Sequence, residues 1–293
     1  MTGARQWIDG ARPRTLPLTI SPVVVGTGIA LVQGAFHPVR ALLALVVGLS
    51  IQVGVNYAND YSDGVRGTDA HRIGPQRLVG SGAVAPRTVK RAALAAFGVA
   101  GAAGLALTLL SQQWWLLGVG AAAIAAAWFY TGGEHPYGYI GLGEVFVFVF
   151  FGLVATVGTS FTQTGRIDAP ALVAGSAQGL GACAVLMANN LRDIPTDVLS
   201  GKHTLAVRLG DGRARAVFLA FCALTVAGVP ALAALTTWWG LLGLALVPWM
   251  IAASATVTRG ARGPDLIPVL KRVGQAQLVG ALGYLLGCVL SPG

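Results

Sequence analysis

NYANDYSDGVRGTD at residues 56–69 ends one long apolar run, and NNLRDIPTDVLSGK at residues 189–202 ends another. Together these two acidic clusters hold five of the eleven acidic residues of the chain. An ionised Asp at the centre of a bilayer costs about 2.5–3.5 kcal/mol on insertion scales. Carboxylates gathered at the ends of membrane helices are therefore expected to face a watery cavity and a bound cation. The first and second acidic clusters outline a candidate active site.

Long apolar runs dominate the rest of the sequence. Of the 293 positions, 55% are hydrophobic and 11% are charged, and the mean hydropathy is +0.69, which is typical of a polytopic membrane protein. A helix needs about 20 residues to cross a core of about 30 Å. We expect one all-α integral membrane domain over residues 1–293, with about nine transmembrane helices around a central cavity open to the cytoplasmic side. The predicted spans are residues 16–35, 39–59, 88–110, 114–131, 141–162, 170–191, 213–235, 238–256 and 272–290.

Basic residues test this count independently, because Lys and Arg accumulate in the cytoplasmic loops of membrane proteins. With the N-terminus in the cytoplasm, eighteen of the twenty Lys and Arg residues lie in inside segments, and only Arg40 and Arg166 lie outside. Both acidic clusters then face the cytoplasm. The net charge of +9 could indicate a nucleic-acid partner, but these charges flank apolar spans instead of forming a basic soluble face. We therefore expect membrane lipid around the chain and no nucleic acid.

The two acidic clusters share a spacing that suggests a weak internal repeat. In each, an Asn is followed four residues later by an Asp, and a further Asp comes next. Residues three or four apart share one face of a helix. Pro195 is expected to weaken the second face, because proline kinks or ends a helix near the preceding residue. The predicted faces are Asn56, Asp60 and Asp63 in the first cluster and Asn189, Asp193 and Asp197 in the second.

Carboxylates mixed with basic residues point to a metal–diphosphate site. Mg²⁺ is commonly held by one or two protein carboxylates, with phosphate oxygens and water completing its octahedron. Arg and Lys can bind phosphate oxygens directly. Helix caps, loop salt bridges and topology signals are the plain structural alternatives for the same residues. The basic residues around the clusters are Arg66, Arg72, Arg77, Arg192, Lys202 and Arg208.

A departing diphosphate leaves a carbocation, which survives only where water is excluded. The fifth predicted span supplies aromatic residues in EVFVFVFF at residues 144–151. In a regular helical projection Glu144, Phe148 and Phe151 share a face, which would put a carboxylate and two cation-stabilising rings on one wall. A carboxylate just inside a span usually faces the bundle interior, whereas Phe also occurs commonly against lipid. Glu144 is therefore the stronger candidate.

These features resemble the UbiA-type superfamily of intramembrane aromatic prenyltransferases. Within it, the chain is most similar to the branch that prenylates 1,4-dihydroxy-2-naphthoate, and the resemblance covers about residues 7–272. The longer gap from Asp63 to Asp69 also separates the chain from hydroxybenzoate-type members. The motifs that carry the resemblance are ARPRTLP at 11–17, NDYSDGVRGTD at 59–69, RLVGS at 77–81, YTGG at 130–133, GLGEV at 141–145, NNLRDIPTD at 189–197 and KHTLAVRLG at 202–210.

The resemblance implies Mg²⁺-dependent transfer of a chain from polyprenyl diphosphate to 1,4-dihydroxy-2-naphthoate, with loss of the carboxylate. This is the membrane step of menaquinone synthesis, placed at the bacterial plasma membrane. The expected catalytic residues are Asp60, Asp63, Asp193, Asp197 and Glu144. The expected metal ligands are Asp60, Asp63, Asp69, Asp193 and Asp197. The expected substrate-binding residues are Asn56, Asn59, Arg66, Arg72, Arg77, Asn189, Asn190, Arg192, Lys202, Tyr130, Tyr139, Phe148 and Phe151.

Two alternatives stay open. Another member of the same superfamily could act on a different aromatic acceptor. A cation-coupled transporter can also have Asp residues on broken helices and an internal repeat, but its site should lie near the bilayer midplane. Both acidic clusters instead occupy long cytoplasmic connections rich in Arg, which favours the enzyme.

Overall fold

The chain is built from helices joined by short turns. Its structure is a computed structural model, which describes residues 3–67 and 77–291. The all-α class predicted from the sequence is confirmed. The elements are α1 (Ala4–Ala11), η1 (Pro13–Thr15), α2 (Pro17–Val32), α3 (Pro38–Arg66), α4 (Pro86–Ser111), α5 (Leu116–Phe129), η2 (Tyr137–Ile140), α6 (Gly143–Val147), η3 (Phe148–Val154), α7 (Ala155–Thr164), α8 (Ala169–Leu199), α9 (Leu205–Leu235), η4 (Trp238–Leu246), α10 (Val247–Thr258), η5 (Gly263–Leu266) and α11 (Ile267–Leu290).

The number of spans is slightly smaller than the nine expected. Within the described residues, seven helices are long and apolar enough to cross a membrane. An eighth span arises if the bent pair Ala4–Thr15 and Pro17–Val32, which meet at 50°, is counted as one. The expected span 114–131 contains α5, whose 14 residues cover only about 21 Å at 1.5 Å per residue. α5 is therefore shorter than a complete crossing of about 30 Å.

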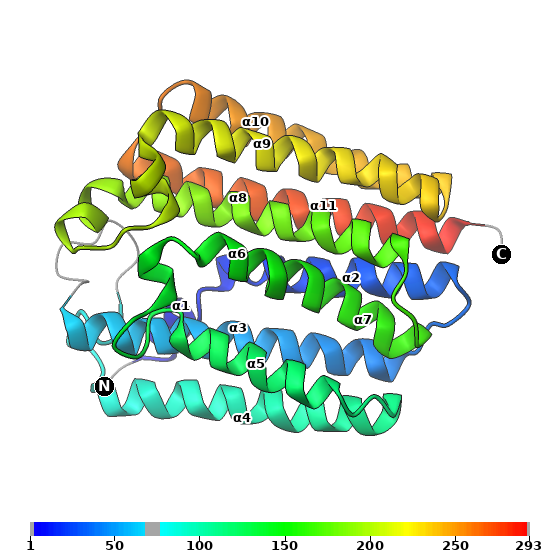
Figure 1. The fold of residues 1–293 in the computed structure, drawn as a ribbon, viewed down its shortest axis with the longest axis horizontal. Helices are drawn as coiled ribbons and strands as arrows, with labels where there is room; N and C mark the ends of the chain where they lie inside the picture. The colour runs from blue at the N-terminus through cyan, green and yellow to red at the C-terminus, as the bar shows by residue number, and fades with distance from the viewer. Residues whose placement is uncertain (1–2, 68–76, 292–293) are drawn as a thin grey trace.

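The long helices lie side by side in two groups. Figure 1 shows α8 to α11 on one side of the bundle, α3 to α5 on the other, and α2, α6 and α7 between them. One buried apolar cluster, which includes Met187, Phe218 and Met250, joins α8 to its neighbours α9 and α10. A separate one, which includes Val89 and Phe97, joins α3 to α4. Each group has its own core, so polar side chains can gather between the groups.

Local sequence signals set the ends of the helices that carry the acidic clusters. Pro38 is the first residue of α3, where its missing N–H costs nothing, and Gly67 closes α3 with φ +74°. At the start of α8, the Asp168 side chain accepts a hydrogen bond from the Ala171 backbone N–H at 3.1 Å. Asp60 and Asp63 of the first cluster are therefore carried on the last turns of α3, and Asp193 and Asp197 of the second on the last turns of α8.

The predicted break of the second helix at Pro195 is wrong. α8 continues to Leu199 with Pro195 inside it. Proline removes one backbone hydrogen-bond donor. The hydroxyl of the following residue, Thr196, donates to the Asp193 carbonyl oxygen at 2.9 Å. One missing bond near the end of a helix of 31 residues does not outweigh the packing that holds that helix. Asp197 thus remains on the same helix as Asp193.

Candidate active site

A cavity of about 630 Å³ lies between the two groups of helices. One end of it is polar, and the remaining wall consists mostly of small and apolar residues from α3, α4, α5 and α7. This combination suits an amphiphilic molecule with a charged head and a long apolar tail. The polar residues that the sequence predicted and that line the cavity are Asn56, Asn59, Asp63, Arg77, Tyr130, Tyr139, Asn189, Asn190, Asp193, Asp197 and Lys202.

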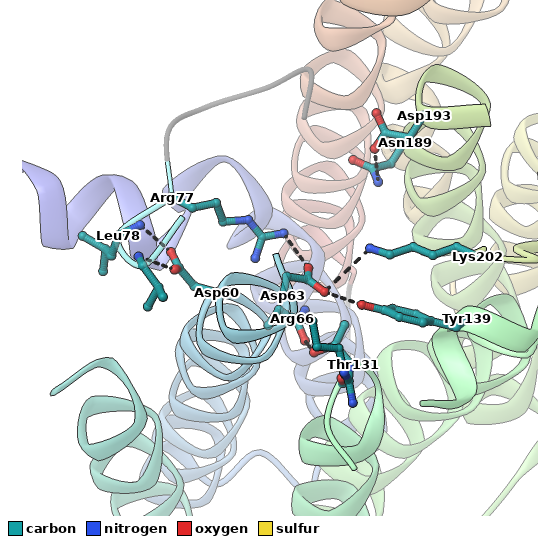
Figure 2. Close-up of polar contacts among 12 residues, drawn as sticks. Asp60, Asp63, Arg66, Arg77, Leu78, Thr131, Tyr139, Asn189, Asp193 and Lys202 are labelled. Carbon is teal, nitrogen blue, oxygen red and sulfur yellow. Dashed lines mark hydrogen bonds and ion pairs between the residues drawn. The ribbon is translucent and has the colours of Figure 1, made fainter. Parts of the chain in front are cut away.

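Asp63 is the point where both acidic clusters meet. Its Oδ1 accepts a hydrogen bond from the Tyr139 hydroxyl at 2.6 Å and lies 3.6 Å from Lys202 Nζ. Its Oδ2 lies 3.2 Å from a guanidinium nitrogen of Arg77. Figure 2 shows these side chains converging on Asp63 from three parts of the chain. The first and second clusters, predicted to face each other, are joined by the Asp63–Lys202 pair.

Asp60 is placed differently from the expectation of a metal ligand. Its Oδ2 accepts a hydrogen bond from the Leu78 backbone N–H at 2.8 Å, and its Oδ1 accepts one from the Val79 N–H at 2.9 Å. The side chain is 1% exposed and does not line the cavity. Both carboxylate oxygens of Asp60 are therefore directed at backbone, away from the other acidic residues.

The two Asn residues and Arg66 of the first cluster attach α3 to its neighbours. Asn56 Nδ2 donates to the Ala11 carbonyl oxygen at 2.8 Å. Asn59 Oδ1 accepts from the Thr131 hydroxyl at 2.7 Å. Arg66 donates to the carbonyl oxygens of Thr131 and Gly133, and so is used in holding the loop after α5. Both Asn residues line the cavity, whereas Arg66 does not.

The second cluster keeps its carboxylates on the cavity wall. Asp193 pairs with Arg192, whose Nε lies 2.6 Å from Oδ1. Arg192 also donates to Asn189 Oδ1 at 2.9 Å, and is itself buried behind the wall. Asp197 Oδ2 accepts from the Thr204 hydroxyl at 3.5 Å. Arg192 therefore orients this cluster from behind, and Asp193 and Asp197 face the space.

Loops from different parts of the chain close the polar end. Lys202 Nζ lies 4.5 Å from the centroid of the Tyr139 ring, close enough for a cation–π contact. The His203 backbone N–H donates to the Tyr139 carbonyl oxygen at 2.8 Å. Arg208 bonds the His203 carbonyl oxygen at 3.1 Å and is exposed, outside the cavity. Lys202 and Tyr139 are thus positioned together, and Arg208 supports them from outside.

The aromatic wall differs from the regular-helix projection. Residues Phe148–Val154 form η3, a π-helix, in which the bonds run from i to i+5 and the residue spacing per turn is larger. As a result Phe151 lines the cavity as predicted, together with Phe146 and Phe150, but Phe148 does not. The Phe148 ring packs against α8, since a Cβ added at Gly179 would lie 2.8 Å from it. The projection of Phe148 onto the cavity face was therefore wrong.

Sequence reasoning also missed Tyr137 and Phe146. Their rings stack with centroids 3.9 Å apart at 21°, and both line the cavity. The Tyr137 hydroxyl donates to the Ala126 carbonyl oxygen at 2.8 Å. Burial raises the pKa of the Tyr137 phenol above its ordinary value, so the ring stays neutral. The alternating Phe pattern of residues 146–151 was the available signal, but it was interpreted with the wrong helical period.

Glu144 is buried beside the second cluster. Its Oε1 accepts a hydrogen bond from Asn190 Nδ2 at 3.0 Å, and its Oε2 is buried with no partner among the described residues. Buried carboxylate oxygens are normally hydrogen-bonded. Asn190 lines the cavity, so Glu144 lies one residue behind the wall. Glu144 therefore has one buried oxygen that no described residue satisfies.

The residues at the polar end suit Mg²⁺, although no side-chain cluster would hold it alone. Within the described ranges, no group of three or more His, Cys, Asp and Glu residues could hold a metal ion. Mg²⁺ usually takes only one or two protein carboxylates and shares the remaining positions with phosphate oxygens and water. One or two of Asp63, Asp193 and Asp197, which all line the cavity, would fit that pattern. Asp69 and Arg72, also predicted for the site, lie outside the described residues.

The sequence matches the model of the UbiA prenyltransferase family over residues 19–266. It is 52% identical over 283 residues to a Mycobacterium tuberculosis protein named 1,4-dihydroxy-2-naphthoate octaprenyltransferase, with 96% of each chain covered. An Escherichia coli protein of the same name is 38% identical, with 97% of this chain and 95% of that protein covered.

Solved structures agree with this family in fold. A UbiA homolog from Archaeoglobus fulgidus, bound to DMAPP and Mg²⁺, has a TM-score of 0.70 at 14% identity and covers 98% of this chain. All of that protein is covered in the comparison. An apo UbiA homolog from Aeropyrum pernix has a TM-score of 0.70 at 19% identity, with 92% of this chain and 97% of that protein covered. The chain belongs to the UbiA prenyltransferase family.

Proposed function

We propose that this protein transfers a polyprenyl chain from polyprenyl diphosphate to 1,4-dihydroxy-2-naphthoate, with loss of the carboxylate as carbon dioxide. The observation that carries this proposal is the cavity, which combines carboxylates and cations at one end with a long apolar arm. The names of the Mycobacterium tuberculosis and Escherichia coli relatives support the choice of acceptor. We extend the proposal to a single functional domain over residues 1–293.

The polar end would bind the diphosphate. Asp63, Asp193 and Asp197 would hold Mg²⁺, which when bound neutralises charge on the phosphate oxygens. Arg77 and Lys202 lie on either side of Asp63 and can move their hydrogen bonds to phosphate oxygens. As the carbon–oxygen bond of the prenyl donor breaks, the electron pair leaves with the diphosphate. These cations then stabilise the departing anion.

The apolar arm would hold the polyprenyl chain. From Asp63 to Ala44, both of which line the cavity, α3 extends for about 28 Å at 1.5 Å per residue. Four lining residues on α4 and α5 are exposed at the surface of the bundle, which marks a lateral opening. A chain too long for the arm would pass there into lipid. These residues are Gly101, Leu105, Leu117 and Ala121.

The aromatic wall would receive both the allylic cation and the acceptor ring. Phe146 and Phe150 present π faces that stabilise a cation, and the apolar surroundings exclude water. Glu144 lies behind Asn190 and has one buried oxygen without a partner among the described residues. When the Asn190 side chain turns aside, Glu144 would accept the hydrogen bond of a naphthol hydroxyl and make the ring more electron-rich. The ring carbon that bears the carboxylate forms the new bond to the prenyl carbon. Loss of carbon dioxide returns the electron pair to the ring and restores aromaticity.

The predicted location is the plasma membrane of a bacterial cell. The predicted orientation has the N-terminus and both acidic clusters on the cytoplasmic side. Single cysteines introduced as Arg166→Cys and Ser200→Cys test it, because these exposed positions lie just beyond opposite ends of α8. The native cysteines Cys183, Cys222 and Cys288 are buried and should give little background. A membrane-impermeant maleimide should label the two introduced cysteines from opposite sides. Labelling of both cysteines from the same side would contradict the predicted topology.

Purified protein supplies the decisive test of the reaction. With Mg²⁺, an allylic polyprenyl diphosphate and 1,4-dihydroxy-2-naphthoate, we expect equal amounts of diphosphate and carbon dioxide. Prenylation of 4-hydroxybenzoate with retention of its carboxylate, and no prenylation of the naphthoate, would contradict the proposed acceptor. Ion-driven uptake without diphosphate release would contradict the proposal that the protein is an enzyme.

A further inference from the structure

Asp60 has an environment unlike those of Asp63, Asp193 and Asp197, the other described acidic residues of the two clusters. Its two oxygens accept hydrogen bonds from successive backbone N–H groups, of Leu78 at 2.8 Å and of Val79 at 2.9 Å. Figure 2 shows Asp60 pointing toward Leu78, whereas Asp63, one turn further along α3, points toward Lys202 and Tyr139. The Asp60 carboxylate thus binds the protein's own backbone, on the side of α3 away from the second cluster.

The segment that Asp60 binds is a compact turn packed closely on α3. The Val84 N–H donates to the Leu78 carbonyl oxygen at 3.0 Å, and the Gly82 N–H to the Val79 carbonyl oxygen at 2.9 Å. Leu78 is 3% exposed. A Cβ at Gly64 would lie 2.4 Å from Val79 Cγ1, so the turn can sit this close only over glycine. The turn is therefore fixed to α3 both by packing and by the Asp60 carboxylate.

Arg77 begins this same turn. Its guanidinium lies 3.2 Å from Asp63 Oδ2, and it lines the cavity. Because neighbouring Cα atoms are only about 3.8 Å apart, fixing the backbone at Leu78 and Val79 restricts where the Arg77 side chain can begin. Asp60 consequently influences the diphosphate end of the cavity through the position of Arg77.

A metal-binding role would conflict with these contacts. Turning Oδ2 of Asp60 toward the cavity would leave the buried Leu78 N–H without its acceptor, which native proteins rarely tolerate. Turning Oδ1 would do the same to the partly buried Val79 N–H. Hydrogen bonds from backbone N–H groups to an ionised carboxylate are also among the stronger ones. The nearby Asp63, Asp193 and Asp197 already line the cavity and need no such rearrangement.

We infer that Asp60 is a positioning residue: it clamps the turn at residues 77–84 onto α3 and thereby holds Arg77 at the diphosphate end of the cavity. The inference rests on the proposed function for what Arg77 binds. The clamp itself does not depend on that function. Asp60 therefore acts on the donor's diphosphate through Arg77 and not through a metal ion.

Amide hydrogen exchange tests the clamp without substrate or metal. In the full-length protein, the Leu78 and Val79 amides should exchange slowly, and Asp60→Asn should speed them by roughly tenfold or more, because one strong acceptor is lost. Asp193→Asn is the matched control in the second cluster and should leave these two amides unchanged. Fast exchange of both amides in the wild-type protein would overturn the inference even if the Asp60→Asn variant cannot be purified.

Binding and kinetics separate positioning from metal ligation. Asp60→Asn should raise the KM for the prenyl diphosphate by about as much as Arg77→Gln, and the double variant should be no worse than Arg77→Gln alone, because both changes remove the same interaction. Mn²⁺ bound by the purified protein at saturating inorganic diphosphate, followed by electron paramagnetic resonance, should be held more weakly in Asp193→Asn and as tightly as in the wild-type protein in Asp60→Asn. Weaker Mn²⁺ binding in Asp60→Asn, matching Asp193→Asn, would make Asp60 a ligand.

These outcomes are distinct from a failure of the proposed function. If the wild-type protein released no diphosphate with 1,4-dihydroxy-2-naphthoate, the proposed reaction would fall, and the exchange and Mn²⁺ measurements would still decide the role of Asp60. If the reaction proceeds but the Asp60→Asn and Arg77→Gln effects on KM add, Asp60 does not act through Arg77 and the inference is overturned.

Discussion

The two acidic clusters have the same spacing and opposite surroundings. In the first, Asp60 is covered by the turn at residues 77–84 and accepts only backbone N–H groups. In the second, the equivalent Asp193 pairs with the buried Arg192 and lines the cavity. Spacing along a helix places both residues on a face, but the element that packs on that face decides whether the carboxylate is available. The shared Asn-x-x-x-Asp pattern is therefore no evidence of shared chemistry.

A second contrast lies within the first cluster itself. Asp60 and Asp63 are both nearly buried, yet Asp63 contacts Arg77, Lys202 and Tyr139, three groups from distant parts of the chain. Such an arrangement orients a carboxylate in a space that opens to the cavity. Low exposure alone does not distinguish a structural carboxylate from a functional one, whereas the identity of the hydrogen-bond donors does.

The largest predicted effect compares the two clusters directly. Asp193→Asn should lower turnover by about a thousandfold, because it removes charge that acts on the departing diphosphate. Asp60→Asn should cost only about tenfold at low donor concentration, since it loosens one positioning contact. Diphosphate release by purified variants measures both. Similar losses of turnover in the two variants would contradict the different roles assigned to Asp60 and Asp193. Full activity of the wild-type protein in EDTA would contradict a metal-binding role for the second cluster.

A smaller effect is expected behind the second cluster. Glu144→Gln should lower kcat by roughly a hundredfold, in the range typical of a positioned general base, and leave the dissociation constant for the prenyl diphosphate unchanged. Single-turnover kinetics combined with a donor-binding titration separates the two quantities. Asn190→Asp, which keeps the size of the residue that contacts Glu144, serves as a companion variant. Weaker binding of the prenyl diphosphate in Glu144→Gln would instead indicate that Glu144 contributes to the diphosphate site.

Removal of one hydroxyl probes the junction of the clusters. Tyr139→Phe deletes the 2.6 Å hydrogen bond to Asp63 and retains the ring beneath Lys202. A hydrogen bond to a charged group contributes about 1.5–3 kcal/mol, so we expect the KM for the prenyl diphosphate to rise by about tenfold. Tyr137→Phe is the control, because the Tyr137 hydroxyl bonds only backbone. Equal effects of the two substitutions would indicate general loosening of the loop.

The smallest effect should come from a position distant from both clusters. Gly101 lines the cavity on α4, and a Cβ there would meet nothing within 4 Å. Gly101→Leu should fold normally and narrow the lateral opening between α4 and α5. We expect turnover of a long polyprenyl donor to fall about twofold to fivefold relative to a short one, on the scale of a few apolar contacts. An unchanged ratio of the two donors would place the exit elsewhere.

Much of this architecture could be predicted from the amino-acid sequence. Long apolar runs, the prolines at helix starts and the clustering of carboxylates at helix ends identified a membrane-embedded helical enzyme with a polar site. The motifs around Asp63, Asp193, Asp197 and Lys202 identified the residues that line it. Those predictions succeeded because hydrophobicity and helix-end preferences are local properties, which each residue carries regardless of its partners.

The failures have a common physical origin in tertiary contact. A regular period of 3.6 residues misplaced Phe148, because η3 packs so closely on α8 that a Cβ at Gly152 would lie 2.5 Å from the Gly175 carbonyl oxygen. Pro195 did not end its helix. α5 is shorter than the apolar run that contains it. For Phe148, this close packing between helices accompanies a period that the local sequence does not announce.

By itself, the sequence determined that this protein is helical, lies in a membrane and carries two acidic clusters, since these follow from composition and periodicity. Only the tertiary structure decided which of the clustered carboxylates would face the cavity. That choice depends on the turn at residues 77–84, which is distant from α8 in sequence. Its backbone N–H groups bind Asp60, whereas Asp63 lines the cavity. A carboxylate takes its role from the donors that reach it, and those donors are brought together only by folding.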